Sequence, residues 1–281
     1  MSKVFLTFLS LFALCIGTGQ DLIEPTDVSN IKAIVIANVN GGINVNPAPG
    51  STLSIKGTIE VDNDVANQIK VKKVIYNDTL IVYVESPVTR LRVDREESNL
   101  LSDNWAVYDW TDNRNCEDFP EFKIDMTVLA PNGIPISIST INEGSIAVKN
   151  MEGPIWVNNI NGAIELKNIA TIKHAKTING DVDLFFKDKV DTNGDFYTLN
   201  GNINAYYTPG TDLNLSFKSF SGDFYTDMDL ESLPSVSTKK SKTSGFTFKL
   251  DKSIKLKMGR GGALHKFETF NGDAIIRTSK G

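Results

Sequence analysis

An Asn-Gly pair between alternating apolar residues recurs along the chain, and this recurrence constrains the fold more than any other feature of the sequence. The pattern is found in NINGAIEL, TINGDVDL, TLNGNINA, TFNGDAII and, with Ser in place of Asn, SFSGDFYT. Taken singly, each segment is typical of a tight β-hairpin turn. A single hairpin, however, does not explain why the same segment returns at a nearly constant spacing.

The glycines of the pattern follow one another at steps of 18, 21 and 21 residues, with a longer step before the last one. They are Gly162, Gly180, Gly201, Gly222 and Gly272, preceded directly by Asn161, Asn179, Asn200, Ser221 and Asn271. Apolar residues stand two positions before them (Ile160, Ile178, Leu199, Phe220, Phe270) and two positions after them (Ile164, Val182, Ile203, Phe224, Ala274). Columns that stay in phase indicate an internal structural repeat.

We therefore expect an all-β fold in which each repeat is one coil of a β-solenoid (parallel β-helix-like), with coils of about 18–21 residues. Strands of successive coils would pair in parallel about 4.8 Å apart, so that like residues stack. Both apolar columns would then face the interior, and the asparagines would form an amide ladder turned toward the core. Glycine would supply a positive φ at the bend. An antiparallel β meander with ordinary hairpins is the alternative.

The remaining segments are arranged around this repeat. We expect a signal peptide at 1–19 and one solenoid domain at 20–281. Within the domain we expect N-terminal coils or a β cap at 20–91, an acidic aromatic excursion at 92–119, regular repeats at 120–230, a Ser- and Lys-rich exposed loop at 231–245 and a C-terminal coil at 246–281.

The first residues predict export. Lys3 precedes an apolar run from Val4 to Ile16 and a small-residue segment, which is the order of a secretory signal peptide. Cleavage near Gln20 would leave Cys116 as the only cysteine, so no intramolecular disulfide could form. Periplasm, cell surface and extracellular medium all remain open. No transmembrane segment is expected in the mature chain, and a formal net charge of −5 argues against nucleic acid as a partner.

The order of these segments resembles an exported bacterial family of β-strand-repeat proteins that carries the adhesin label and has no established function. The resemblance rests on IKAIVIANVNGGINV, DTLIVYV, FKIDMTVLAPNGIPISISTINEGSIAVKN, INGAIEL, INGDVDL and the closing FETFNGDAIIRTSKG, which span nearly all of the chain after residue 20. It implies a β-solenoid and an envelope location. It carries over no catalytic residue.

Residues suited to catalysis or metal binding are sparse, and we expect no catalytic site, cofactor or metal. His174, His265 and Cys116 do not make up a zinc ligand set, and either histidine is interpreted as a surface or strand residue. The column directly after the repeat glycine contains Ala163, Asp181, Asn202, Asp223 and Asp273. These positions suit a weak cation site or a glycosidase-like pair, but solvated turn chemistry is the favoured interpretation.

Three aromatic residues in the acidic excursion are the candidate ligand-binding residues: Trp105, Tyr108 and Trp110. Flat aromatic rings beside carboxylates can stack on sugars or anchor a protein partner. Alternatively, the excursion folds back and the rings cap the solenoid. The sequence thus predicts a non-enzymatic envelope adhesin that binds a glycan or an envelope or surface protein through a solenoid surface. A structural or accessory envelope scaffold is the alternative, and a carbohydrate-active enzyme is the least favoured function.

Overall fold

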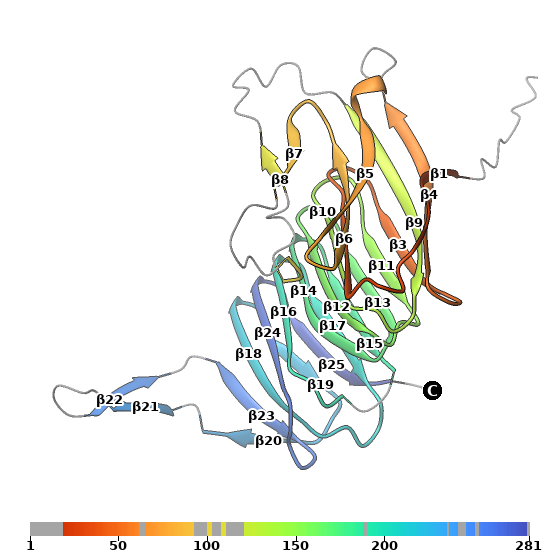
Figure 1. Cartoon of the computed structure of the whole chain (residues 1–281). Helices are drawn as coiled ribbons and strands as arrows, with labels where there is room; N and C mark the ends of the chain where they lie inside the picture. The colour runs from red at the N-terminus through yellow and green to blue at the C-terminus, as the bar shows by residue number, and fades with distance from the viewer. Residues whose placement is uncertain are drawn as a thin grey trace, which may run out of the picture.

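The computed structural model shows an all-β chain with two large and mostly parallel sheets, an arrangement consistent with a β-solenoid (Figure 1). It describes residues 19–61, 66–92, 100–102, 108–110, 121–187, 190–234, 236–240, 246–250 and 253–279. Residues 1–18 of the predicted signal peptide, and Cys116, lie outside the described residues.

The ten strands of sheet A are, in spatial order, β1 (Gln20–Asp27), β4 (Thr52–Val61), β9 (Phe122–Pro131), β3 (Ile43–Ala48), β11 (Ile146–Lys149), β13 (Ile164–Ile169), β15 (Val182–Phe186), β17 (Ile203–Tyr207), β25 (Ala274–Thr278) and β19 (Phe224–Thr226). The eleven strands of sheet B are β20 (Leu230–Leu233), β23 (Ile254–Met258), β18 (Leu213–Ser221), β24 (Leu264–Asn271), β16 (Gly194–Asn200), β14 (Thr171–Asn179), β12 (Pro154–Asn159), β10 (Ile136–Thr140), β2 (Ala33–Ala37), β6 (Thr79–Glu85) and β5 (Lys70–Tyr76). Two small antiparallel sheets pair β7 (Thr89–Leu91) with β8 (Tyr108–Trp110) and β21 (Val236–Lys240) with β22 (Phe246–Leu250), and η1 (Ala66–Gln68) is a 3-10 turn.

Each Asn-Gly corner carries the chain from a strand of sheet B to a strand of sheet A. Within sheet A, Ile146 pairs in parallel with Ile164, and Ile164 pairs in parallel with Val182, in both cases across 18 residues. Val182 pairs in the same way with Ile203, across 21 residues. The repeats are therefore stacked in parallel, and the antiparallel meander is not their arrangement.

The coils do not stack in chain order at the C-terminal end. The coil of β24 and β25 lies between the coil of β16 and β17 and the coil of β18 and β19. Asn271 accordingly pairs with Asn200 on one side and with Ser221 on the other. The cause is the intervening chain: β23 pairs antiparallel with β18 and with β20, so the chain passes around the edge of sheet B before it returns into the stack.

The N-terminal region supplies both a coil and antiparallel edge strands. The corner at Gly41 continues the stack, since the Gly41 N–H donates to the Asn142 carbonyl at 2.9 Å. Beyond this coil, β9 pairs in parallel with β3 and antiparallel with β4, while β6 pairs in parallel with β2 and antiparallel with β5. The parallel stack thus ends in antiparallel strands on both sheets.

Only one of the two predicted apolar columns faces the interior. In the column after the glycine, Ile164, Val182, Ile203 and Ala274 are fully buried. In the column before it, the exposed fraction is 79% for Phe220 and 42% for Phe270, which corrects the expectation of a second interior column. These residues point outward because strand side chains alternate and the residue before each of them takes the inward position.

That inward position, three residues before each glycine, is polar, and the sequence analysis overlooked it. Its members share an amide or hydroxyl group, and all but the half-buried Ser219 are buried: Asn38, Asn159, Thr177, Thr198 and Thr269, with Thr140 in the coil that has an extra residue at its turn. Thr177 Oγ1 donates to the Gly162 carbonyl at 2.9 Å, and Thr198 Oγ1 donates to the Gly180 carbonyl at 2.8 Å. A buried carbonyl without a donor is costly, so this column satisfies the corners from inside.

The asparagine ladder lies on the outside of the same corners. Asn179 Nδ2 donates to Asn161 Oδ1 at 2.7 Å, Asn200 donates to Asn179 at 2.8 Å, and Asn271 donates to Asn200 at 2.9 Å. Asn161 donates to Asn142, which extends the ladder by one coil. All these side chains except that of Asn142 are exposed, so the ladder does not face the core as expected.

The predicted loop at 231–245 contains strands. Residues 230–233 form β20, and residues 236–240 form β21, which pairs with β22 in a hairpin that projects from the body (Figure 1). Residues 241–245 lie outside the described part of the chain. The alternation in SVSTKK and FTFKL permits strand pairing despite the Ser and Lys content.

Replacing a corner glycine is expected to destabilise the fold. A Cβ at Gly201 would lie 2.1 Å from the Gly180 carbonyl oxygen, which belongs to backbone that cannot move aside alone. We expect Gly201→Ala to lower the free energy of unfolding by about 3 kcal/mol, measured by urea unfolding. The control is Gly133→Ala, where no atom lies within 4 Å of an added Cβ and a change below about 0.5 kcal/mol is expected. Equal effects at the two sites would contradict the stacking contact.

Both histidines are buried and uncharged at neutral pH. His265 is fully buried, its Nδ1 lies 2.6 Å from Tyr207 Oη, and its Nε2 lies 3.1 Å from the Thr192 carbonyl oxygen. Burial lowers the pKa of His265 to about 4. Burial and then the Lys176 ammonium lower the pKa of His174 to about 4. Because Thr192 offers an acceptor, Nε2 of His265 carries the proton and Nδ1 accepts from Tyr207.

These two histidines predict a loss of stability in mild acid. An unfolded histidine binds its proton near pH 6.5, whereas the folded ones bind it only near pH 4, so stability is complete above about 6.5 and falls between these values. The loss reaches about 3 kcal/mol per histidine. In urea unfolding at several pH values, His174→Gln is expected to show a shallower decline than the unaltered chain. Identical slopes would contradict the assignment.

Candidate functional site

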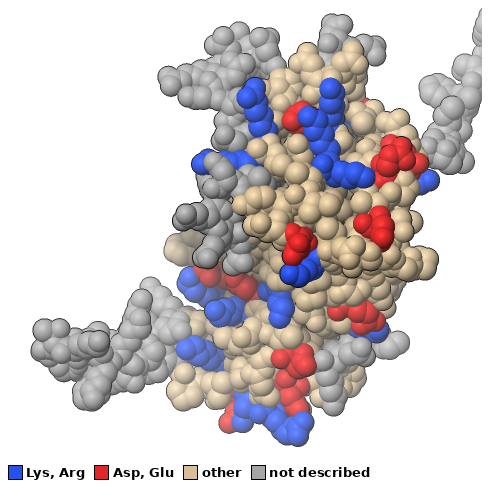
Figure 2. All heavy atoms as spheres, viewed as in Figure 1, with Lys and Arg blue, Asp and Glu red and all other residues tan. Residues whose placement is uncertain are grey.

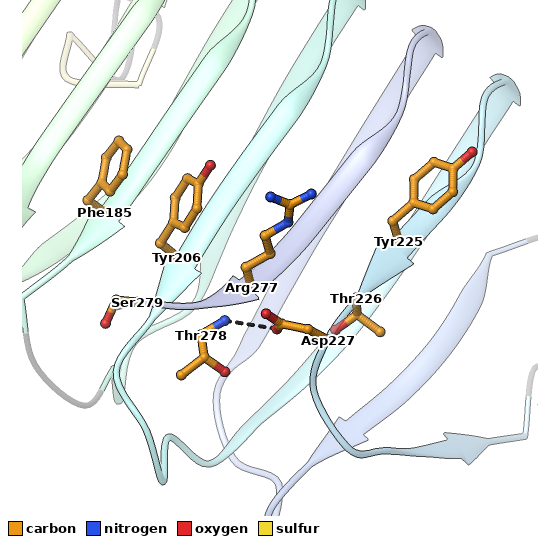
Figure 3. A pocket seen from close by; sticks show the side chains of 8 residues that line it. All are labelled: Phe185, Tyr206, Tyr225, Thr226, Asp227, Arg277, Thr278 and Ser279. Atoms are coloured by element: carbon orange, nitrogen blue, oxygen red, sulfur yellow. Dashed lines mark hydrogen bonds between the residues drawn. The ribbon is translucent and has the colours of Figure 1, made fainter. Parts of the chain in front are cut away.

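A groove with a volume of about 620 Å³ lies on the outer face of sheet A, where the sheet ends at β25 and β19 (Figure 3). Its lining comes from four neighbouring strands and from the residues that follow two of them. The lining residues are Phe185, Tyr206, Tyr225, Thr226, Asp227, Arg277, Thr278 and Ser279.

Strand alternation and the parallel register place these side chains in a row. In β17 and β25, residues such as Ala205 and Ile276 are buried, so their neighbours Tyr206 and Arg277 point outward. Phe185 pairs with Tyr206, and Tyr206 pairs with Arg277. Each member of the row stands five residues after a repeat glycine: Lys149, Lys167, Phe185, Tyr206, Arg277 and Asp227. This column was a signal in the sequence that the sequence analysis did not use.

Two aromatic rings form one side of the groove. The rings of Phe185 and Tyr206 are stacked with centroids 4.5 Å apart and an interplanar angle of 4°. Lys167 Nζ lies 5.3 Å from the centroid of Phe185 and donates to Glu165 Oε2 at 2.6 Å, so this cation is neutralised. Among the described residues, the Tyr206 hydroxyl has no hydrogen-bond partner. The result is a rigid apolar surface with one free polar group at its rim.

Arg277 stands between Tyr206 and Tyr225 in Figure 3. Its side chain is exposed, and its guanidinium forms no hydrogen bond or ion pair with any residue that the structure describes. The nearby Asp227 carboxylate instead accepts the Thr278 backbone N–H at 3.0 Å, and the guanidinium points away from it (Figure 3). The groove therefore holds a cation that is not neutralised by the groove's own carboxylate.

Tyr225 closes the far side of the groove at the edge strand β19. It is 50% exposed, and its hydroxyl donates to Asp223 Oδ2 at 3.4 Å. The carboxylates of Asp223 and then Asp273 raise the pKa of Tyr225, so the phenol stays protonated. Apolar ring faces, hydroxyl groups and a guanidinium in one hollow suit the binding of a polar ligand with a flat apolar face. Glycoside hydrolases use a pair of carboxyl groups, and the described lining of the groove contains one carboxylate, that of Asp227.

Of the three predicted ligand-binding aromatic residues, only Tyr108 has a described side chain, and that side chain is buried. Tyr108 is buried with 6% exposure, and its hydroxyl donates to the Ala37 carbonyl at 2.7 Å and accepts the Val84 N–H at 3.1 Å. Burial raises the pKa of Tyr108. Trp105 lies outside the described residues, and of Trp110 only the backbone, in β8, is described.

Tyr108 points inward because the excursion folds back over sheet B. Ser137 Oγ on β10 donates to the Leu101 carbonyl at 2.7 Å, and all residues of β2 and β10 are buried on both faces. The described part of the excursion therefore covers the outer face of sheet B at β2 and β10, while the groove lies on sheet A. This corrects the expectation that Tyr108 is available to a ligand.

The acidic column after the glycines is used within the fold. Asp181 Oδ1 accepts the Asn202 N–H at 2.7 Å, and Asp273 Oδ1 accepts the Asp223 N–H at 2.9 Å. Asn202 takes the same role toward Asp273 at 2.9 Å. No group of three or more potential metal ligands among His, Cys, Asp and Glu is present in the described residues. Asp181, Asn202 and Asp273 thus form a second ladder, in which each side chain binds the backbone of the neighbouring coil.

Charge is distributed without a dominant sign on the face shown in Figure 2, where Lys and Arg alternate with Asp and Glu. Among the described residues, several charged side chains form exposed ion pairs, such as Lys176 with Asp195 at 2.8 Å. Within the described ranges, no helix is long and apolar enough to cross a membrane.

No family model matches this sequence, and no curated protein matches it. Similar solved structures include a putative cell adhesion protein from Clostridium sporogenes, 10% identical, with a TM-score of 0.42 over 91% of this chain and 98% of that one. A putative adhesin from Bacteroides fragilis is 11% identical, with a TM-score of 0.34 over 91% and 95% of the two chains. A putative lipid binding protein from Parabacteroides distasonis is 11% identical, with a TM-score of 0.23 over 92% and 96%. TM-scores this low carry no argument, so the function is argued from the groove.

The role of the acidic column can be tested with and without a divalent cation. We expect Asp181→Ala to lower the free energy of unfolding by about 1 kcal/mol, because one hydrogen bond to a backbone N–H is lost. We also expect Ca²⁺ to leave the melting temperature of the unaltered chain unchanged, as measured by circular dichroism. A Ca²⁺-dependent rise in melting temperature that Asp181→Ala removes would instead establish a cation site.

Proposed function

We propose that this chain is a non-enzymatic, exported cell-envelope protein that acts as an adhesin by binding a glycan in the groove of sheet A. The observation that carries the proposal is the stacked pair of Phe185 and Tyr206 beside the unneutralised guanidinium of Arg277. A ring face binds the apolar C–H face of a sugar, and the surrounding hydroxyl and charged groups bind its hydroxyl groups.

The size of the groove favours a short glycan over a protein. A volume of about 620 Å³ lies within the range of small-molecule sites, roughly 300–1,000 Å³. A stable protein partner requires about 800 Å² of buried surface on each side, which extends well beyond these eight lining residues. The hollow is also lined by hydroxyl groups that suit a polyhydroxylated ligand.

An exported location is supported by the order of charged, apolar and small residues from Lys3 to Gly19, and by the family resemblance. Export alone leaves periplasm, cell surface and medium open. An adhesive role requires the groove to face the outside of the cell.

A structural or accessory envelope scaffold is the second candidate, and one observation favours it. Phe220 and Phe270 are stacked on the outer side of the Asn-Gly corner with centroids 4.6 Å apart, and both are exposed. Exposed apolar side chains that gather in a patch mark contacts with other proteins. A scaffold would use this corner and leave the groove empty.

A glycan array tests the proposal against this second candidate. We expect the chain to bind at least one oligosaccharide, and Tyr206→Leu to weaken that binding by about tenfold or more. Tyr197→Leu is the matched control, because Tyr197 is a half-buried, outward-facing tyrosine on β16 of sheet B. Binding that is lost equally in both variants, or that neither change affects, would refute the groove as the site. Circular dichroism checks that both variants keep the fold.

A further inference from the structure

We infer that the groove selects an acidic sugar, whose carboxylate is bound by Arg277 while its ring lies against Tyr206. The inference rests on the proposed function and adds the chemical class of the ligand. Its basis is the combination of a planar cation, a planar ring and a polar rim in one hollow.

Several cations among the described residues form ion pairs with carboxylates, whereas Arg277 forms none. Lys167 is bonded to Glu165, Lys218 to Glu268, and Arg260 to Asp212. Arg277 forms no such pair within the described part of the chain, although Asp227 lines the same groove. A guanidinium that stands free in a hollow is available to a ligand anion without first breaking an ion pair.

The planar shape of the Arg277 guanidinium suits a carboxylate ligand. A guanidinium presents its N–H donors as a planar fork that binds the two oxygens of a carboxylate in parallel. A carboxylate attached to a sugar ring lies close to that ring, so the two groups need receptors that lie side by side. Tyr206 and Arg277 are direct partners in neighbouring strands, which provides this arrangement.

Asp227, the one acidic residue of the described lining, is turned away from Arg277 (Figure 3), and its carboxylate accepts the Thr278 N–H at 3.0 Å. Its negative charge in the same groove disfavours a ligand with several anionic groups, so a ligand with a single carboxylate is expected. The other oxygen of Asp227 can accept a sugar hydroxyl group.

The test uses a panel of oligosaccharides that contain uronic or sialic acids, each paired with its methyl ester, together with neutral and sulfated members. Esterification removes the charge and leaves the sugar ring in place. We expect the chain to bind one or more free acids and to lose about tenfold to a hundredfold in affinity for the ester. Arg277→Gln should lose a similar factor for the acid only, and Arg277→Lys should be intermediate because it keeps the charge without the fork.

The matched control is Lys266→Gln, which removes one exposed cation from the same coil on the outer face of sheet B. It should leave affinity for the acid unchanged, because Lys266 lies away from the groove. A melting curve for each variant checks that the fold is kept.

Each outcome separates the two proposals. Binding of neutral sugars that depends on Tyr206 but not on Arg277 overturns the acidic class and leaves the proposed function standing. Preference for a sulfated member over every carboxylated one overturns the carboxylate as the group that Arg277 binds and leaves the proposed function standing. Failure to bind any member, with folded protein, overturns both.

Discussion

The structure depends on the contact between the glycine corners of neighbouring coils. At each corner the backbone of one coil lies directly against the next glycine, so that a Cβ at Gly272 would lie 1.9 Å from the Gly201 carbonyl oxygen. Only a hydrogen atom fits there, so each of these corner positions must be a glycine. Once this register is set, every other position of the coil is aligned with its counterpart, because the strands pair in parallel. The interior, the ladders and the groove all follow from this one alignment.

Polar groups on both sides of the corner make that alignment specific. Outside, asparagine amides bind one another in exposed surroundings, where each hydrogen bond contributes about 1 kcal/mol or less. Inside, the buried hydroxyl group of Thr198 binds a glycine carbonyl of the neighbouring coil, and the loss of a buried donor costs more. A slipped coil would leave such a carbonyl without a donor. The buried column thus opposes misregister, while the exposed ladder adds to the stability of the correct one.

The position of the groove follows from how the two sheets are covered. Sheet B is covered on its outer face by the excursion near β2 and β10, and at its edge by β23 and β20. Sheet A ends instead in the three-residue strand β19, with its outer face open beside Phe185, Tyr206 and Arg277. The proposed binding site is therefore a row of side chains on the outer face of sheet A. This row is rigid because the rings of Phe185 and Tyr206 are stacked on each other. A rigid site loses little entropy when a ligand binds.

The sequence by itself determined the all-β class, the parallel stacking and the asparagine ladder, because these depend on local spacing that repeats along the chain. It also contained the outward column five residues after each glycine, although chain order alone would have placed Tyr206 next to Asp227. Only the tertiary structure decided that the last coil enters the stack between them and brings Arg277 beside Tyr206. It also decided that Tyr108 is buried and that the Phe220 column faces outward. These outcomes depend on which distant strands compete for the same sheet edge, and spacing along the chain carries no information about that competition.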